Sequence, residues 1–121
     1  MSYAELTKDW LTSGGEEDIS ARVRDFLARN VGPAVAVAGG LAAKGGSQTG
    51  AVLLGPALMG AKALPMTATV TWAREGDGVR VTARFVDTYA LKFPGLFGIA
   101  KYEKRFKELA AKLQAILPPQ R

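Results

Sequence analysis

Two stretches in the second half of the chain alternate between apolar and polar residues with a period of two. Their apolar positions are Met66, Ala68, Val70 and Trp72, then Val79, Val81, Ala83 and Phe85. Such alternation is typical of strands with one buried face. Residues 75–78, Glu-Gly-Asp-Gly, lie between them, and glycine supplies the positive φ that tight hairpin turns need. The pattern predicts a β-hairpin with Trp72 opposite Val81 and Ala68 opposite Phe85.

A helical pattern follows, from about Leu96 to Leu117. Apolar residues recur there at steps of three and four, which place them on one stripe of a helix. They are Ile99, Tyr102, Phe106, Leu109, Leu113 and Ile116. The opposite face, which we expect to be solvated, carries Lys101, Lys104, Arg105, Lys107, Glu108 and Lys112. A hairpin is marginal in water by itself, so we expect this helix to cover its apolar face.

The first half of the chain predicts one further helix. Ser13 to Glu16 matches a capping box, and apolar residues follow at helical spacing as far as Asn30. Residues 4–12 suit either a strand or a short helix. The strand is favoured, because a two-stranded sheet is too small to cover both helices.

Three segments lie between that helix and the hairpin. Residues 33–38 predict a strand, and residues 41–49 predict a glycine-weakened strand that pairs back onto it. Residues 50–65 are apolar but show neither the period of a strand nor that of a helix. We interpret them as a buried crossing loop or a short irregular helix. The expected fold is a single α+β domain over residues 1–121. It has an antiparallel sheet of four to five strands, with the N-terminal helix and the long C-terminal helix packed on one face.

Composition excludes several chemistries. The chain has no cysteine and no histidine, which removes disulfides, thiolate and imidazole metal sites, and catalytic triads based on histidine. Residues 55–62, GPALMGAK, miss the phosphate-loop pattern, because Ala61 separates Gly60 from Lys62 and no hydroxyl follows. Asp87 lies at the end of the hairpin and could serve as a general acid. The favoured interpretation is a structural carboxylate that accepts hydrogen bonds from loop amides. We therefore expect no catalytic residue, no metal and no cofactor.

Charge is unevenly distributed along the chain. The net charge is +5, and residues 61–121 hold 11 Lys and Arg against 5 Asp and Glu. Such a basic half suits nucleic acid or an anionic membrane surface, although a solvated helix face is the favoured explanation. The apolar runs are shorter than the roughly 20 residues of a membrane span. No signal sequence is evident, so we expect a cytoplasmic protein.

The aromatic residues offer a candidate ligand site. If the hairpin, the C-terminal helix and residues 50–65 enclose a cavity, its lining would be mostly apolar with a few polar groups. The candidate lining residues are Trp72, Phe85, Tyr89, Tyr102 and Phe106. A filled core built from the same residues is the competing interpretation.

The order of these elements resembles the START-like, helix-grip superfamily. The helix start at residues 13–16 after a first strand, and the hairpin plus helix over residues 64–117, carry the resemblance. It implies a sheet wrapped on the C-terminal helix with an apolar ligand between them.

The function favoured by the sequence is non-enzymatic binding of an apolar or amphipathic small molecule between the sheet and the C-terminal helix. One alternative is an assembly module that forms a homo-oligomer or docks a partner through the C-terminal helix or residues 50–65. Another is binding of anionic lipid or nucleic acid by the basic half.

Overall fold

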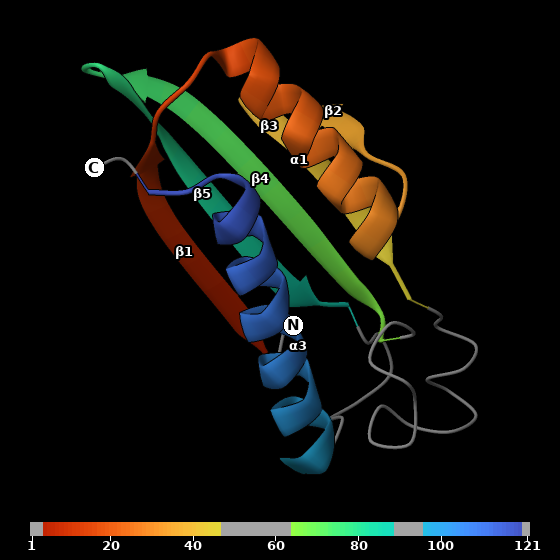
Figure 1. Cartoon of the computed structure of the whole chain (residues 1–121). Helices are drawn as coiled ribbons and strands as arrows, with labels where there is room; N and C mark the ends of the chain where they lie inside the picture. The colour runs from red at the N-terminus through yellow and green to blue at the C-terminus, as the bar shows by residue number, and fades with distance from the viewer. Residues whose placement is uncertain (1–3, 47–63, 89–95, 120–121) are drawn as a thin grey trace.

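The computed structural model describes residues 4–46, 64–88 and 96–119, and it has the expected α+β class (Figure 1). Its elements are β1 (Glu5–Thr12), α1 (Glu16–Asn30), β2 (Val35–Val37), β3 (Gly40–Gly45), β4 (Met66–Glu75), β5 (Gly78–Asp87) and α3 (Leu96–Ile116). The segment expected to cross before the hairpin lies outside the described residues except for Leu64 and Pro65, both of which are buried.

The five strands form one antiparallel sheet in the order β1-β5-β4-β3-β2. Residues 5–12 are a strand, as favoured above, and they pair with β5 along their whole length. The helical alternative for this segment is therefore wrong. The first strand thus lies beside the last one, and the other strands follow in reverse sequence order.

The hairpin has the predicted register. Trp72 lies opposite Val81 and Ala68 opposite Phe85. The turn is the central pair Gly76 and Asp77, because Glu75 already pairs with Gly78. Gly76, the first residue of the turn, has a φ of 61°. Among the described residues only glycines have a positive φ, so Asp77, the second residue of the turn, does not. That pattern is the one that type II′ turns require.

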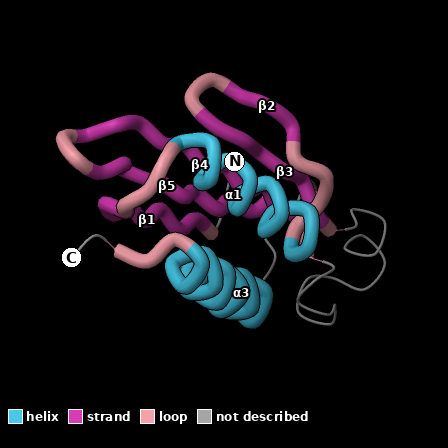
Figure 2. The backbone as a smooth tube through the Cα atoms, turned by 45° about the horizontal axis from the view of Figure 1, so that its top comes forward, coloured by secondary structure: helices cyan, strands magenta, loops and turns pink. Residues whose placement is uncertain are grey.

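Both helices lie on the same face of the sheet (Figure 1). α3 contacts β1 and β5, and α1 contacts β3 and β4. No described element covers the opposite face in the turned view of Figure 2. The buried set includes most inward residues of β4 and β5 and the middle of the predicted apolar stripe of α3, from Tyr102 to Leu113. Trp72, Ile99 and Ile116 are only partly buried. The core is therefore a single layer between the sheet and the two helices.

The start of α1 differs from the prediction. Its N-cap is Gly15, with φ −85° and ψ 151°, and no side chain caps the helix. Glu16 is therefore the first helical residue rather than the third, and Ser13 cannot form the predicted capping box. Gly14, with a φ of 115°, redirects the chain between the end of β1 and the helix.

The two short strands occupy less of the chain than predicted. β2 and β3 cover 35–37 and 40–45, and residues 47–49 of the expected second strand lie outside the described residues. Gly40 is needed where β3 meets β4, because an added Cβ would lie 2.0 Å from the main-chain oxygen of Val70. β2 ends the sheet, and its Val35 and Val37 remain exposed.

The predicted position of one residue of α3 is wrong. Arg105 was expected among the solvated basic side chains, but it is only 4% exposed. α1 packs beside α3, so the buried part of α3 is wider than the stripe that faces the sheet alone.

Candidate ligand-binding site

Three of the five predicted lining residues meet between β5 and α3. The rings of Phe85 and Phe106 are stacked with centroids 5.9 Å apart and planes at 25°. Tyr102 lies against Phe106 at 5.6 Å. All three side chains are fully buried. We call this group the aromatic cluster; its rings pack against one another, as aromatic pairs in cores do.

The Tyr102 hydroxyl has a structural partner. It donates a hydrogen bond of 2.7 Å to the main-chain oxygen of Pro65, just before β4 begins. Buried tyrosines generally need such a partner for the hydroxyl. The bond ties the N-terminal half of α3 to the start of the hairpin.

Trp72, the fourth predicted residue, does not join this cluster. Trp72 lies four residues along β4 from Ala68, the residue opposite Phe85, which is about 13 Å of strand. It is partly exposed and lines a separate open groove of about 450 Å³ near the hairpin turn. Tyr89 lies outside the described residues.

A groove between the two helices lies next to α3. It has a volume of about 390 Å³, within the range of about 300–1,000 Å³ typical of small-molecule sites. Its lining residues are Asp25, Phe26, Arg29, Asn30, Lys112, Ala115 and Ile116. Phe26, Ala115 and Ile116 provide apolar surface, and charged side chains flank it. We call it the α1–α3 groove.

The charges of this groove are predominantly positive. Arg29 forms an exposed ion pair of 2.9 Å with Asp25 on the preceding turn of α1. Lys112, on α3, is exposed. The groove therefore joins an apolar surface to a cationic rim, which is the combination that an amphipathic anion needs.

Arg105 lies below the surface at the Asn30 end of the groove. Its Nη2 donates a hydrogen bond of 2.8 Å to the main-chain oxygen of Asn30, the last residue of α1. Its Nε is buried and has no hydrogen-bond partner. Burial lowers the pKa of the Arg105 guanidinium, and the charge of Glu108 opposes this shift. The carbonyl end of a helix favours a cation, which offsets part of the cost of burial.

The sequence contained a signal for Arg105 that its charge obscured. It lies three residues after Tyr102 and four before Leu109, both on the apolar stripe. It also precedes Lys112 by seven residues, about two turns along the same side of the helix. Spacing alone therefore places it at the border of the buried face.

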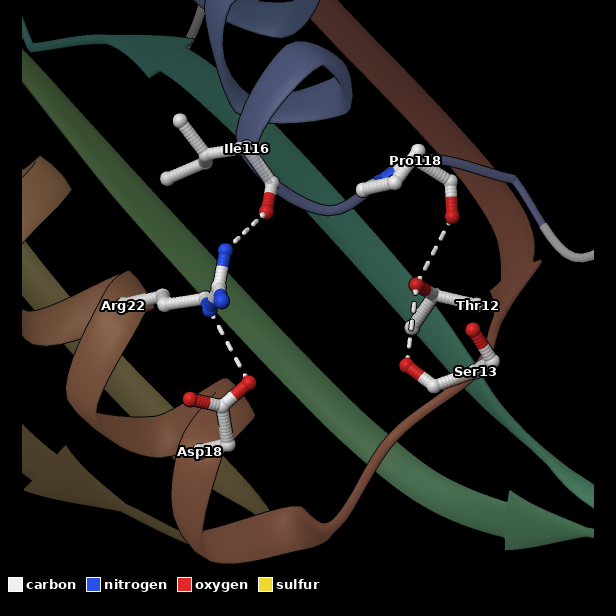
Figure 3. Close-up of polar contacts among 6 residues, drawn as sticks. All are labelled: Thr12, Ser13, Asp18, Arg22, Ile116 and Pro118. Carbon is white, nitrogen blue, oxygen red and sulfur yellow. Dashed lines mark hydrogen bonds and ion pairs between the residues drawn. The ribbon is translucent and has the colours of Figure 1, made fainter.

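The C-terminal end of α3 fixes the other end of the groove (Figure 3). Arg22 donates to the main-chain oxygen of Ile116 at 3.2 Å and pairs with Asp18 at 2.9 Å. The Thr12 hydroxyl donates to the oxygen of Pro118 at 2.8 Å. The Trp10 indole donates to the oxygen of Leu117 at 2.8 Å. We call these contacts the C-terminal latch; they satisfy two carbonyls that the end of α3 leaves without partners, those of Ile116 and Leu117, and the carbonyl of Pro118 that follows.

The remaining candidates for chemistry have structural roles. Asp87 is buried and accepts a hydrogen bond from the main-chain N–H of Ala4, as expected for a strand-end carboxylate. Arg80 and Arg84 on the uncovered face of the sheet pair with Glu75 and Glu5. Within the described part of the chain no group of acids is placed to hold a metal ion, and no helix is long and apolar enough to cross a membrane.

Comparisons of the chain with models of protein families, with curated proteins and with solved structures found no match.

Proposed function

We propose that this protein binds an amphipathic small molecule without chemically changing it, with the apolar part of the ligand held in the groove between α1 and α3. The observation that carries the proposal is the α1–α3 groove. It presents Phe26 and Ile116 beside the cationic groups of Arg29 and Lys112. Small-molecule sites combine an apolar lining with a few polar groups in this way.

The topology of the sheet supports the proposal. The N-terminal strand lies beside the last strand, and the C-terminal helix lies across both. This arrangement agrees with the resemblance to the helix-grip superfamily, in which a ligand lies between the sheet and that helix. The aromatic cluster here is packed, so the proposed site for the ligand is the groove between the helices.

The apolar stripe of α3 is less suited to a partner protein. Tyr102, Phe106, Leu109 and Leu113 have no exposed surface, because the stripe already packs inside the fold. Docking through that stripe would require α3 to leave the sheet. Binding a small molecule at the groove leaves the fold intact.

Filling the groove tests the proposal. Ala115 is exposed and lines the groove, whereas Ala111, one turn earlier on α3, is exposed and does not line it. We expect Ala115→Trp to weaken the binding of dodecanoate and dodecanol by about tenfold or more, because the indole occupies the apolar surface. Isothermal titration calorimetry on the purified protein measures this effect.

The matched control is Ala111→Trp, which adds the same side chain to the same helix and should bind as the wild type does. Native mass spectrometry of the purified protein provides a second readout, a copurified small molecule. Wild-type protein that carries no ligand and binds neither probe would refute the proposal. Equal losses in the two variants would place the ligand elsewhere than in the groove.

A further inference from the structure

Arg105 is a buried cation without a counter-ion. The side chain is 4% exposed, and no described carboxylate forms an ion pair with it. The one acid whose charge acts on it, Glu108, is an exposed residue of the next turn. Arginine is almost never buried unless it is paired, because the loss of hydration is costly.

The hydrogen bonds of Arg105 leave part of its donor capacity unused. A guanidinium carries five N–H donors in a planar fork. Nη2 donates to the oxygen of Asn30, while Nε has no partner and no contact with solvent. A buried donor without an acceptor destabilises the protein, so its presence calls for a ligand, a water or a function.

The neighbouring charges favour an anion at this position. Asn30 connects Arg105 to the α1–α3 groove, whose rim carries Arg29 and Lys112. The acid in the groove, Asp25, is already paired with Arg29. The lining of the groove has two cationic groups and one acidic group. Arg105, which is bonded to Asn30, adds a third positive charge next to the groove, so this region attracts negative charge.

We propose that Arg105 binds the carboxylate of the ligand, and that the ligand is therefore a carboxylic acid with an apolar tail. The inference rests on the proposed function. A carboxylate is planar and matches the guanidinium fork, and charge-assisted bonds of this kind are the strongest available to the protein. The carboxylate supplies both the missing counter-ion and the acceptor for Nε, and the tail lies on the apolar wall formed by Phe26 and Ile116.

Two probes that differ only in the head group test the inference. We expect wild-type protein to bind dodecanoate about tenfold or more tightly than dodecanol, measured by isothermal titration calorimetry. Arg105→Met keeps an unbranched apolar stem but removes the guanidinium fork. It should bind dodecanol as the wild type does and bring the two affinities within about threefold of each other.

The control variant is Lys107→Met, which removes one positive charge from an exposed position of α3. It should retain the preference for dodecanoate, which separates a specific contact from a change in net charge. Unchanged preference in Arg105→Met would refute the inference. Loss of the preference in both variants would reduce it to long-range attraction and would also refute it.

Stability without ligand separates a binding role from a structural one. If Arg105 serves the ligand, Arg105→Met should have an unchanged or higher Tm, because an uncompensated buried charge is replaced by apolar volume. A lower Tm together with an unchanged preference would mean that Arg105 only caps α1. If Arg105→Met does not fold, Arg105→Lys replaces it. The lysine variant keeps the charge without the fork, and we expect it to lose part of the preference.

The two proposals fail in different ways. Wild-type protein that binds neither probe refutes the proposed function. Wild-type protein that binds both probes equally retains the proposed function and refutes the carboxylate. The same comparison made with Ala115→Trp, where both affinities should fall together, shows whether the apolar tail and the head group share one site.

Discussion

Trp10 shows how one side chain joins the first strand to the last helix. Its indole N–H donates to the oxygen of Leu117 inside the core, 107 residues away in the chain. The bond satisfies a carbonyl that α3 itself leaves free. The sequence does not predict this contact, because the partner of Trp10 depends on where the end of α3 lies.

Trp10→Phe tests this contact at the residue scale. We expect a loss of about 1–3 kcal/mol in the free energy of unfolding, because the oxygen of Leu117 is left buried without a donor. Urea denaturation measures the loss. The matched control is Trp72→Phe, the same change at the partly exposed tryptophan of β4, which should cost less. Equal losses would show that the bond to Leu117 contributes nothing beyond ring size.

At the scale of the elements, the start of α1 lacks a side-chain cap. Gly15 caps it without a side-chain acceptor, although three acidic residues in the first turn complement the helix dipole. An added Cβ at Gly15 would meet no atom within 4 Å. The predicted capping box was wrong because the conformation of Gly14 moves the start of the helix two residues beyond the position that the sequence motif implied.

Gly15→Ser should therefore stabilise the protein. The serine hydroxyl can accept a free N–H of the first turn, and the loss of a glycine reduces the entropy of the unfolded chain. We expect a gain of about 0.5–1 kcal/mol in the free energy of unfolding. Gly14→Ser is the matched control and should destabilise, because Gly14 has a φ of 115° that serine adopts only with strain. A gain in both variants would contradict this account of the N-cap.

The other predicted elements follow from short-range patterns. The hairpin register was predicted correctly, because the period of two and the Gly76-Asp77 turn both fix it. The extent of α3 was also predicted to within one residue. β2 was predicted too long at both ends, because alanine and valine in 33–38 give no signal for where pairing with β3 begins.

For the molecule as a whole, the uncovered face of the sheet links stability to pH. Hydrogen bonds from Arg84 and Arg80 lower the pKa of Glu5 and of Glu75. A carboxyl whose pKa is lowered by folding stabilises the protein above its unfolded pKa, about 4.3 for glutamate. That contribution disappears as the pH falls through the lower pKa of the folded state. Both groups are exposed, so the effect is a modest one.

We expect the urea midpoint of the wild type to fall as the pH decreases below about 4.5. The fall should be smaller in the double variant Glu5→Gln with Glu75→Gln, which has no carboxylate to protonate at these positions. A matched double variant, Asp77→Asn with Glu103→Gln, changes two exposed acids that form no ion pair among the described residues. It should follow the wild type. Identical curves for all three proteins would show that the two ion pairs do not contribute.

The sequence by itself determined the elements and most of their buried faces, because alternation and helical spacing are local and report which side of each element avoids water. It also brought Phe85, Tyr102 and Phe106 together, since the apolar sides of β5 and α3 have to meet. Only the tertiary structure decided that α1 lies beside α3, and therefore that a groove exists between them and that Arg105 is buried at its end. Neither outcome is local: each depends on which helix is the neighbour, and the periodicity of a single helix contains no information about that.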